Sequence, residues 1–101
     1  MITDFELLDG PWEAVGHLAA PVRIAVFVDE QRVPRTLEWD GADETALHVV
    51  AMAPNGDAVA TARLLPDGHV GRMAVLHEWR GIGLGRLIME RTVAVARRNG
   101  H

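Results

Sequence analysis

Two short turn sequences constrain the fold of this chain more than any other feature. Proline, glycine and aspartate gather at 54–57 and at 66–68, and each group separates two runs of mostly apolar residues. Turns of this length join antiparallel neighbours, because a parallel connection needs a crossover of a dozen or more residues. The middle of the sequence therefore predicts a three-stranded antiparallel meander with strands at 46–53, 58–65 and 69–76.

A strand and a helical segment are predicted ahead of this meander. Weak alternation of apolar residues at 5–8 indicates a short first strand, and Asp9-Gly10-Pro11 is typical of a turn that would end it. Apolar residues then recur at helical spacing over 12–30. Because Pro21 interrupts this period, the segment is predicted to be either two helices or one bent helix that ends near Gln31.

A loop and one long helix complete the predicted elements. Residues 32–45 contain proline, glycine and several acids, which is typical of a loop. A wide apolar arc that starts at Gly83 or Gly85 predicts a helix as far as Asn99, where Asn-Gly is a common stop. The order of elements predicts a single α/β domain (α+β) over 1–101, with helices packed on a mainly antiparallel sheet.

Four residue types are missing from the 101 residues, namely Cys, Ser, Lys and Tyr. Without Cys there are no disulfides, thiolate metal sites or thiol nucleophiles. Without Ser and Lys there is no Ser-His-Asp triad, no Schiff base and no phosphate-binding P-loop lysine. An enzyme of this composition must work by positioning, backbone donors and acid–base help from Asp, Glu, His or Arg.

Charge is distributed unevenly over a net value of −4. Residues 1–50 hold ten acidic residues against three Arg, whereas 51–101 hold four against seven. The acidic balance argues against a nucleic acid partner, although the basic half is able to meet a small polyanion. Uneven solvated charge without functional meaning is the alternative. With no signal peptide and no apolar run of membrane length, we expect a cytoplasmic protein that does not bind membranes.

The most informative stretch lies between the last predicted strand and the long helix, at Arg80-Gly81-Ile82-Gly83-Leu84-Gly85-Arg86. Alternate glycines allow backbone N–H groups to approach a ligand, and a helix that starts there directs its positive dipole end to the same place. Phosphate oxygens suit such a site. A glycine-rich turn that merely redirects the chain is the alternative. A dinucleotide-binding fingerprint would need glycine where Arg86 stands, and a P-loop would need lysine.

This stretch resembles the acetyl-CoA motif of the GNAT N-acetyltransferase superfamily, Arg/Gln-x-x-Gly-x-Gly/Ala after a strand. Segments 23–34, 61–64 and 71–75 are similar to the ElaA-type branch, so the resemblance spans roughly 12–100. It implies an N-acetyltransferase that takes acetyl-CoA as co-substrate and the amine of a small molecule or protein as acceptor. It also implies that the following residues bind the co-substrate: Met73, Ala74, Val75, Arg80, Gly81, Ile82, Gly83, Leu84, Gly85 and Arg86.

Acceptor-binding and acid–base residues are less clearly indicated. Acidic residues at Glu30, Glu38 and Asp40 are candidates for holding a cationic acceptor, and the acidic half of the chain suits the same role. Facing water is the common alternative for acidic loop residues. His48 is expected to be a sheet-face histidine satisfied by its neighbours, so the catalytic acid and base stay unassigned. The histidines lack close metal-ligand spacing, and no metal site is expected.

Relatives of this type continue past the motif helix with further strands and a helix, whereas this sequence stops at His101. The resemblance therefore implies about two-thirds of the fold, with an open sheet edge that we expect a second copy of the chain to cover in a dimer. A non-catalytic CoA-binding or protein-interaction module is the competing hypothesis. Without the missing third, a lone monomer is expected to be poorly active.

Overall fold

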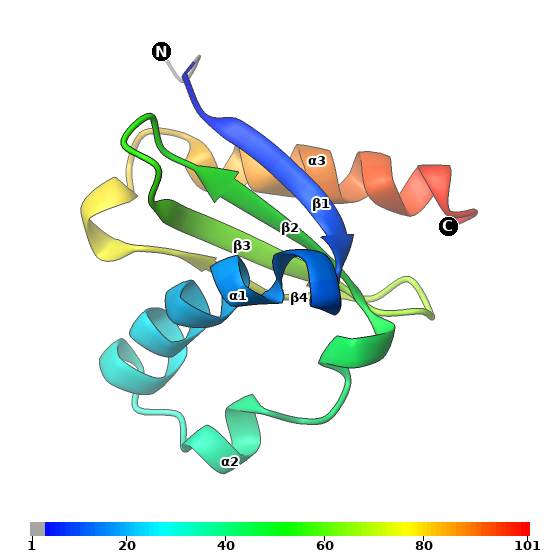
Figure 1. The fold of residues 1–101 in the computed structure, drawn as a ribbon, viewed down its shortest axis with the longest axis horizontal. Helices are drawn as coiled ribbons and strands as arrows, with labels where there is room; N and C mark the ends of the chain where they lie inside the picture. The colour runs from blue at the N-terminus through cyan, green and yellow to red at the C-terminus, as the bar shows by residue number, and fades with distance from the viewer. Residues whose placement is uncertain (1–3) are drawn as a thin grey trace.

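The computed structural model describes residues 4–101. Its strands form one antiparallel sheet of four in sequence order, β1-β2-β3-β4 (Figure 1). The predicted meander is present, with the turn bonds Gly56 N–H to Ala53 O and Gly68 N–H to Leu65 O. The strands are β1 (Glu6–Pro11), β2 (Leu47–Met52), β3 (Ala58–Leu64) and β4 (Val70–Val75). The expected α/β fold class, with a mainly antiparallel sheet and helices packed on it, is confirmed.

The prediction of a turn at Asp9-Gly10-Pro11 is wrong, because β1 runs straight through these residues. Gly10 pairs with His48 and Pro11 pairs with Leu47. A proline is tolerated there since β1 is an edge strand, whose outer side needs no N–H donor. Pro11 also serves as the N-cap of the next helix, which begins at the following residue and leaves no room for a turn.

One continuous helical segment follows β1, which decides between the two predicted alternatives. It consists of α1 (Trp12–Arg23) and a π-helical extension, η1 (Ile24–Glu30), and its C-cap is Gln31. Pro21 lies inside α1, where it has no N–H to donate to the preceding turn. The wider π-helical turns begin at Ile24, three residues after Pro21. In this segment Val26 and Phe27 pack against the end of β4.

The predicted loop at 32–45 contains two single turns of helix, α2 (Arg35–Glu38) and the 3₁₀ turn η2 (Asp43–Thr45). Propensity alone does not sustain helices this short, so their packing must hold them. Glu38 and Asp43 are both buried, unlike most of their neighbours. These two acids are the anchors of the segment.

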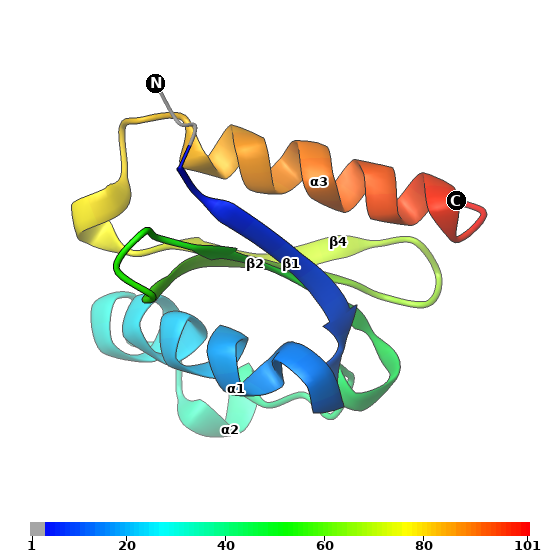
Figure 2. The same cartoon turned by 45° about the horizontal axis from the view of Figure 1, so that its top comes forward.

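Helices cover both faces of the sheet (Figure 2). Helix α3 (Leu84–Arg98) buries Ile88 and Val95 against one face, where Val49 and Ala51 of β2 meet it. Helix α1 packs on the opposite face, where the intervening Val50 contacts its apolar side. This alternation along β2 is the period-two pattern of a strand that is buried on both faces.

The 3₁₀ turn η3 (His77–Trp79) and a glycine-rich bend connect β4 to α3. The predicted start of the long helix agrees with the observed Leu84 to within a residue. Within residues 4–101, β4 is an edge strand of the sheet, and the turn and bend follow it directly in the chain.

Candidate functional site

The bend before α3 has an open helix N-terminus. Gly81 and Gly83 adopt φ angles of 83° and 88°, in the left-handed region that favours glycine. Gly83 is the N-cap and provides no side-chain hydrogen bond; its carbonyl accepts the bond from the Leu87 N–H at 3.2 Å. The N–H groups that precede Leu87 therefore have no partner in the helix, and the positive end of the helix dipole adds to them.

Gly85 needs a different explanation from the two glycines before it. It lies in the first turn of α3 without a positive φ, where glycine costs about 1 kcal/mol relative to alanine. Among residues 4–101, a Cβ at this position would meet only the Cγ2 atom of Val75, at an ordinary 3.9 Å. Neither backbone conformation nor packing within the protein requires glycine here. Close approach of a ligand to the backbone does explain it.

A cavity of about 410 Å³ lies on one side of β4, and a second of about 400 Å³ lies at the bend. The bend cavity is open to the N-terminus of α3 and receives Val26 and Gln31 from the helical segment opposite. Eight of the ten residues expected to bind the co-substrate line it: Met73, Ala74, Val75, Arg80, Gly81, Gly83, Leu84 and Gly85. The remaining two lie at the surface, where Ile82 is exposed and Arg86 pairs with Glu90 at 3.0 Å.

Arg80 at the rim of the bend cavity is held by two neighbours. Its Nη1 and Nη2 atoms donate to the carboxylate of Glu30 at 2.7 and 2.6 Å, and its Nε donates to the Val75 carbonyl at 2.9 Å. The hydrogen bond from Arg80 holds the pKa of Glu30 below its usual range, and Glu30 raises the pKa of Arg80. The structure thus brings Glu30, expected to meet the acceptor, to the proposed co-substrate side.

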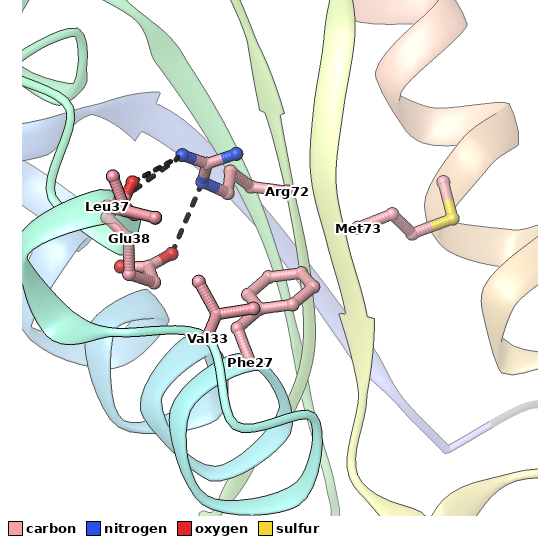
Figure 3. Close-up of a pocket in the computed structure, with 6 residues that line it drawn as sticks. All are labelled: Phe27, Val33, Leu37, Glu38, Arg72 and Met73. Atoms are coloured by element: carbon pink, nitrogen blue, oxygen red, sulfur yellow. Dashed lines mark hydrogen bonds and ion pairs between the residues drawn. The ribbon is translucent and has the colours of Figure 1, made fainter.

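A bulge distorts β4 at its centre. Gly71 pairs with Arg63 and Ala74 with Thr61, so two residues of β4, Arg72 and Met73, lie opposite one residue of β3. Arg72 has φ of 47°, which is unusual for a residue with a side chain. Bulges redirect side chains, and in this strand Arg72 points toward α2 while Met73 points toward α3 (Figure 3).

The cavity of about 410 Å³ lies on the α2 side of β4 (Figure 3). Its lining residues are Phe27, Val33, Leu37, Glu38, Arg72 and Met73. Met73 also lines the bend cavity, so the two cavities adjoin at this residue. An arrangement of two cavities along one open strand edge can hold two molecules that react with each other at the edge.

Ion pairs surround the α2 side of this cavity. Glu38 is 1% exposed and accepts a hydrogen bond from Arg23 Nε at 2.9 Å. Asp40 accepts bonds from both Nη atoms of Arg63, at 2.8 and 2.9 Å, which holds the pKa of Asp40 far below its usual range. Arginines from three other elements reach these two carboxylates, while Oε2 of Glu38 has no hydrogen-bond partner within residues 4–101. The expectation that they hold a cationic acceptor stays a prediction.

Comparison with known proteins connects this geometry to a family. The model of the acetyltransferase (GNAT) family matches residues 12–101, which is most of the chain. The chain belongs to the GNAT acetyltransferase family. A Bacillus subtilis (strain 168) protein named as a putative acetyltransferase is 34% identical over 90 residues, covering 83% of this chain and 60% of that protein.

Two crystal structures share the fold of this GNAT chain. An acyl-CoA N-acyltransferase from Pseudomonas aeruginosa is 30% identical with a TM-score of 0.81, covering 93% of this chain and 71% of that one. Escherichia coli ElaA is 28% identical with a TM-score of 0.82, covering 95% and 72%. The resemblance to the family, with ElaA as a structural neighbour, is confirmed. The chain spans 60% of the length of the Bacillus subtilis relative.

The histidines of the GNAT chain differ in their surroundings. His48 is buried on β2, where its Nε2 lies 3.0 Å from the Asp43 carbonyl oxygen, and burial lowers its pKa. His77 lies exposed in η3, beside Glu78. Among residues 4–101, no group of three or more histidines and acids is arranged to hold a metal ion. No helix in the described part of the chain has the length and apolar character needed to cross a bilayer.

Sequence reasoning missed the arginines near the cavity on the α2 side of β4. Arg23 is fully buried within α1 and lies over the rings of Trp12 and Trp39, at 5.6 and 5.2 Å from their centroids. A charged residue on the apolar face of a predicted helix is a signal of such a role. Arg72 gave no comparable signal, because its position depends on the bulge.

Proposed function

We propose that this chain binds acetyl-CoA along β4 and the bend before α3, and transfers its acetyl group to the amine of an acceptor. Gly85 is the observation that carries the proposal. Because Gly85 has no side chain, the backbone N–H groups in the first turn of α3 stay accessible from the bend cavity. Neither the conformation nor the packing of residues 4–101 requires glycine at this position. The co-substrate's pyrophosphate has the charge and size to use that space.

The edge of β4 supports the other half of the co-substrate site. Met73, Ala74 and Val75 line the bend cavity and belong to a strand that has no outer neighbour among residues 4–101. Such an edge can pair with the amides of a pantetheine arm as it would with another strand. The bulge at Arg72 interrupts this pairing, so we place the reacting end of the arm near Met73.

Acetyl-CoA supplies an activated acyl group, and the protein positions it. The acceptor nitrogen bonds to the acetyl carbon, the carbon–sulfur bond breaks, and the proton lost by the amine ends on the released thiol. The sequence contains no Cys, Ser, Lys or Tyr, which supports direct transfer between two bound molecules without a covalent enzyme intermediate on those side chains. Proximity and backbone donors on β4 provide the catalysis.

Exposed apolar groups on β4 and α3 support the proposal that a second copy of the chain covers this part of the surface. Val70 on β4 and Met89 and Val93 on α3 are between 36% and 39% exposed. An unpaired strand beside such a surface favours association. Sedimentation equilibrium tests this directly: we expect a dimer, and a stable monomer with ordinary acetyltransferase turnover would contradict the proposal.

Substituting Gly85 by alanine separates co-substrate binding from stability. The change is expected to raise the free energy of unfolding by up to about 1 kcal/mol, because alanine favours a helix more than glycine. At the same time the added methyl group should weaken CoA binding by about tenfold or more, since it occupies the approach of the phosphates to the backbone. Isothermal titration with CoA and chemical denaturation measure both quantities.

Gly10→Ala is the matched control. Its Cβ would meet Ala14 at an ordinary 3.6 Å, and it lies on β1, away from the cavity. It should leave CoA affinity unchanged. Equal CoA affinity in wild type and Gly85→Ala would refute the proposed site. Binding of CoA without thiol release from acetyl-CoA over a panel of amines would instead favour the non-catalytic CoA-binding module.

A further inference from the structure

The cavity on the α2 side of β4 combines apolar walls with one accessible charge. Phe27, Val33 and Leu37 provide the apolar walls, and the polar groups are the side chains of Glu38 and Arg72. The two differ in accessibility, because Glu38 is 1% exposed whereas the side chain of Arg72 is 28% exposed. A ligand in this cavity therefore meets more of the guanidinium than of the carboxylate.

Hydrogen bonds leave part of the Arg72 guanidinium unused. Its Nη2 donates to the carbonyls of Leu37 and Glu38 and to Asp40 Oδ2, at 3.2 to 3.4 Å. Its Nε lies 3.3 Å from Glu38 Oε1 but forms no hydrogen bond. Within residues 4–101, Nη1 has no partner, and it points away from Leu37 and Glu38 (Figure 3). Nη1 is free to donate to a ligand.

The neighbouring acids do not depend on Arg72 for their charge compensation. Arg23 bonds to Glu38 at 2.9 Å, and Arg63 bonds to Asp40 at 2.8 Å, both shorter than any contact of Arg72. The long contacts of Arg72 are therefore the ones most readily exchanged for a better acceptor. A ligand carboxylate is such an acceptor, because an ionised oxygen forms stronger hydrogen bonds with a guanidinium than a backbone carbonyl does.

We propose that this cavity binds the acceptor as an amino acid with an apolar side chain, and that Arg72 binds its carboxylate. The proposal rests on the proposed acetyl transfer. The apolar walls take the side chain, and the amine lies toward Met73, where the cavity adjoins the one assigned to the co-substrate. This is the opposite of the charge preference that the acidic first half of the sequence suggests, because Glu38 and Asp40 beside the cavity are already paired with arginines.

Binding of a matched pair of reaction products tests the proposal without requiring turnover. N-acetyl-L-leucine and N-acetyl-L-leucinamide differ only in the carboxylate, and each is titrated into the isotope-labelled chain and followed by NMR. We expect the acid to bind about tenfold more tightly than the amide. The amide signals of Val33, Leu37 and Arg72 should shift. Equal affinities, preference for the amide, or no binding of either in the millimolar range would overturn the proposal.

Substitutions of Arg72 and Arg35 test whether Arg72 causes the preference for the acid over the amide. Arg72→Gln should bind acid and amide equally, whereas Arg35→Gln removes an equal charge from the exposed surface of nearby α2 and should keep the full preference. A preference that survives Arg72→Gln would contradict the assignment. Arg72→Lys keeps the charge without the fork of donors and should keep part of the preference. If Arg72→Gln does not fold, the affinities of wild type and Arg72→Lys for the acid and the amide still test the assignment.

Failure of this proposal differs from failure of the proposed function. Titration with CoA reports the co-substrate site alone. Loss of CoA binding with retained preference for the acid would refute acetyl transfer but leave the carboxylate site. Normal CoA binding with no preference would refute the carboxylate site alone. Turnover of L-leucine against L-leucinamide then links the two sites, and we expect kcat/KM to favour L-leucine by about tenfold.

Discussion

Two arginine–carboxylate groups in this molecule show how burial changes what the same chemistry does. Glu30 and Arg80 form a bidentate pair at the rim of the bend cavity, and each side chain is 38% exposed. Arg23 and Glu38 form a pair between α1 and α2 in which both side chains are 1% exposed. Water can replace either partner of the first pair but not of the second. The buried pair therefore stabilises the fold, whereas a ligand can replace one partner of the exposed pair.

The buried pair is part of a network of three arginines and three carboxylates, whose outer members Arg72 and Asp40 are 28% and 36% exposed. The network joins α1, α2, the turn η2 and strands β3 and β4, and so connects the segment around α2 with the sheet. Its members are Arg23, Arg63, Arg72, Glu38, Asp40 and Asp43. Such networks hold geometry well when every partner is present and become costly when one is removed.

The largest effect is expected from Arg23→Ala. This change leaves Glu38 and Asp43 buried without their closest cation, and such a loss typically costs about 3–5 kcal/mol. Chemical denaturation should show a correspondingly lower free energy of unfolding. Arg35→Ala, an exposed change on α2, should have little effect. A loss of stability below about 1 kcal/mol for Arg23→Ala would mean that water reaches this network. The buried and exposed pairs would then not differ in the way described above.

A smaller effect is expected from Glu30→Gln. It is a gain in CoA affinity, whereas Arg23→Ala lowers stability. Arg80 must give up Glu30 before it can bind a phosphate, so a neutral partner should tighten CoA binding about three- to tenfold. Unfolding should be unchanged, because the pair is exposed. Isothermal titration measures the affinity.

Glu78→Gln is the control for this change. It removes the same charge next to Arg80 in the sequence but does not hydrogen-bond to it. An equal gain in both variants would indicate a general charge effect and not the release of Arg80. Weaker CoA binding in Glu30→Gln would mean that the pair is needed to shape the rim.

The smallest effect concerns pH. Burial lowers the pKa of His48 below its ordinary value of about 6.5, so the unfolded state takes up the proton first as pH falls. His48 therefore contributes stability that is present above about pH 6.5 and lost as pH falls from there toward its folded pKa. Asp40, whose pKa is also lowered, contributes stability that is lost only below about pH 4.

Denaturation at a series of pH values separates the two steps. His48→Gln should flatten the step below about pH 6.5 and keep the acid one, whereas His17→Gln on the exposed side of α1 should keep both. A step below about pH 6.5 that is unchanged in His48→Gln would assign it to another group.

Local sequence patterns predicted most of the secondary structure and the place of the bend cavity. Turns at 54–57 and 66–68 specify the meander because their chemistry acts within a few residues. The alternate glycines at 81–85 mark the bend for the same reason. The first turn was misplaced because Asp9-Gly10-Pro11 has the composition of a turn, and only pairing with β2 made it a strand.

Acceptor-side residues were beyond such patterns. Glu38 and Asp40 look like solvated loop acids, and nothing near them in the sequence shows the arginines that neutralise them. Their partners Arg23, Arg63 and Arg72 lie on α1, β3 and β4, between 15 and 34 residues away along the chain. The charge of the first half of the sequence therefore does not show which of its acids are paired with arginines.

By itself the sequence determined the antiparallel meander, the long helix after a glycine-rich bend, the resemblance to the GNAT family and the absence of common nucleophiles. Each of these depends on neighbouring residues or on composition. The tertiary structure decided which charges are paired: within residues 4–101, Nη1 of Arg72 has no partner, while Glu30, Glu38 and Asp40 each accept hydrogen bonds from arginines. The physical reason is that charge compensation depends on distances in space, and distant segments reach each other only when the sheet and its helices pack together.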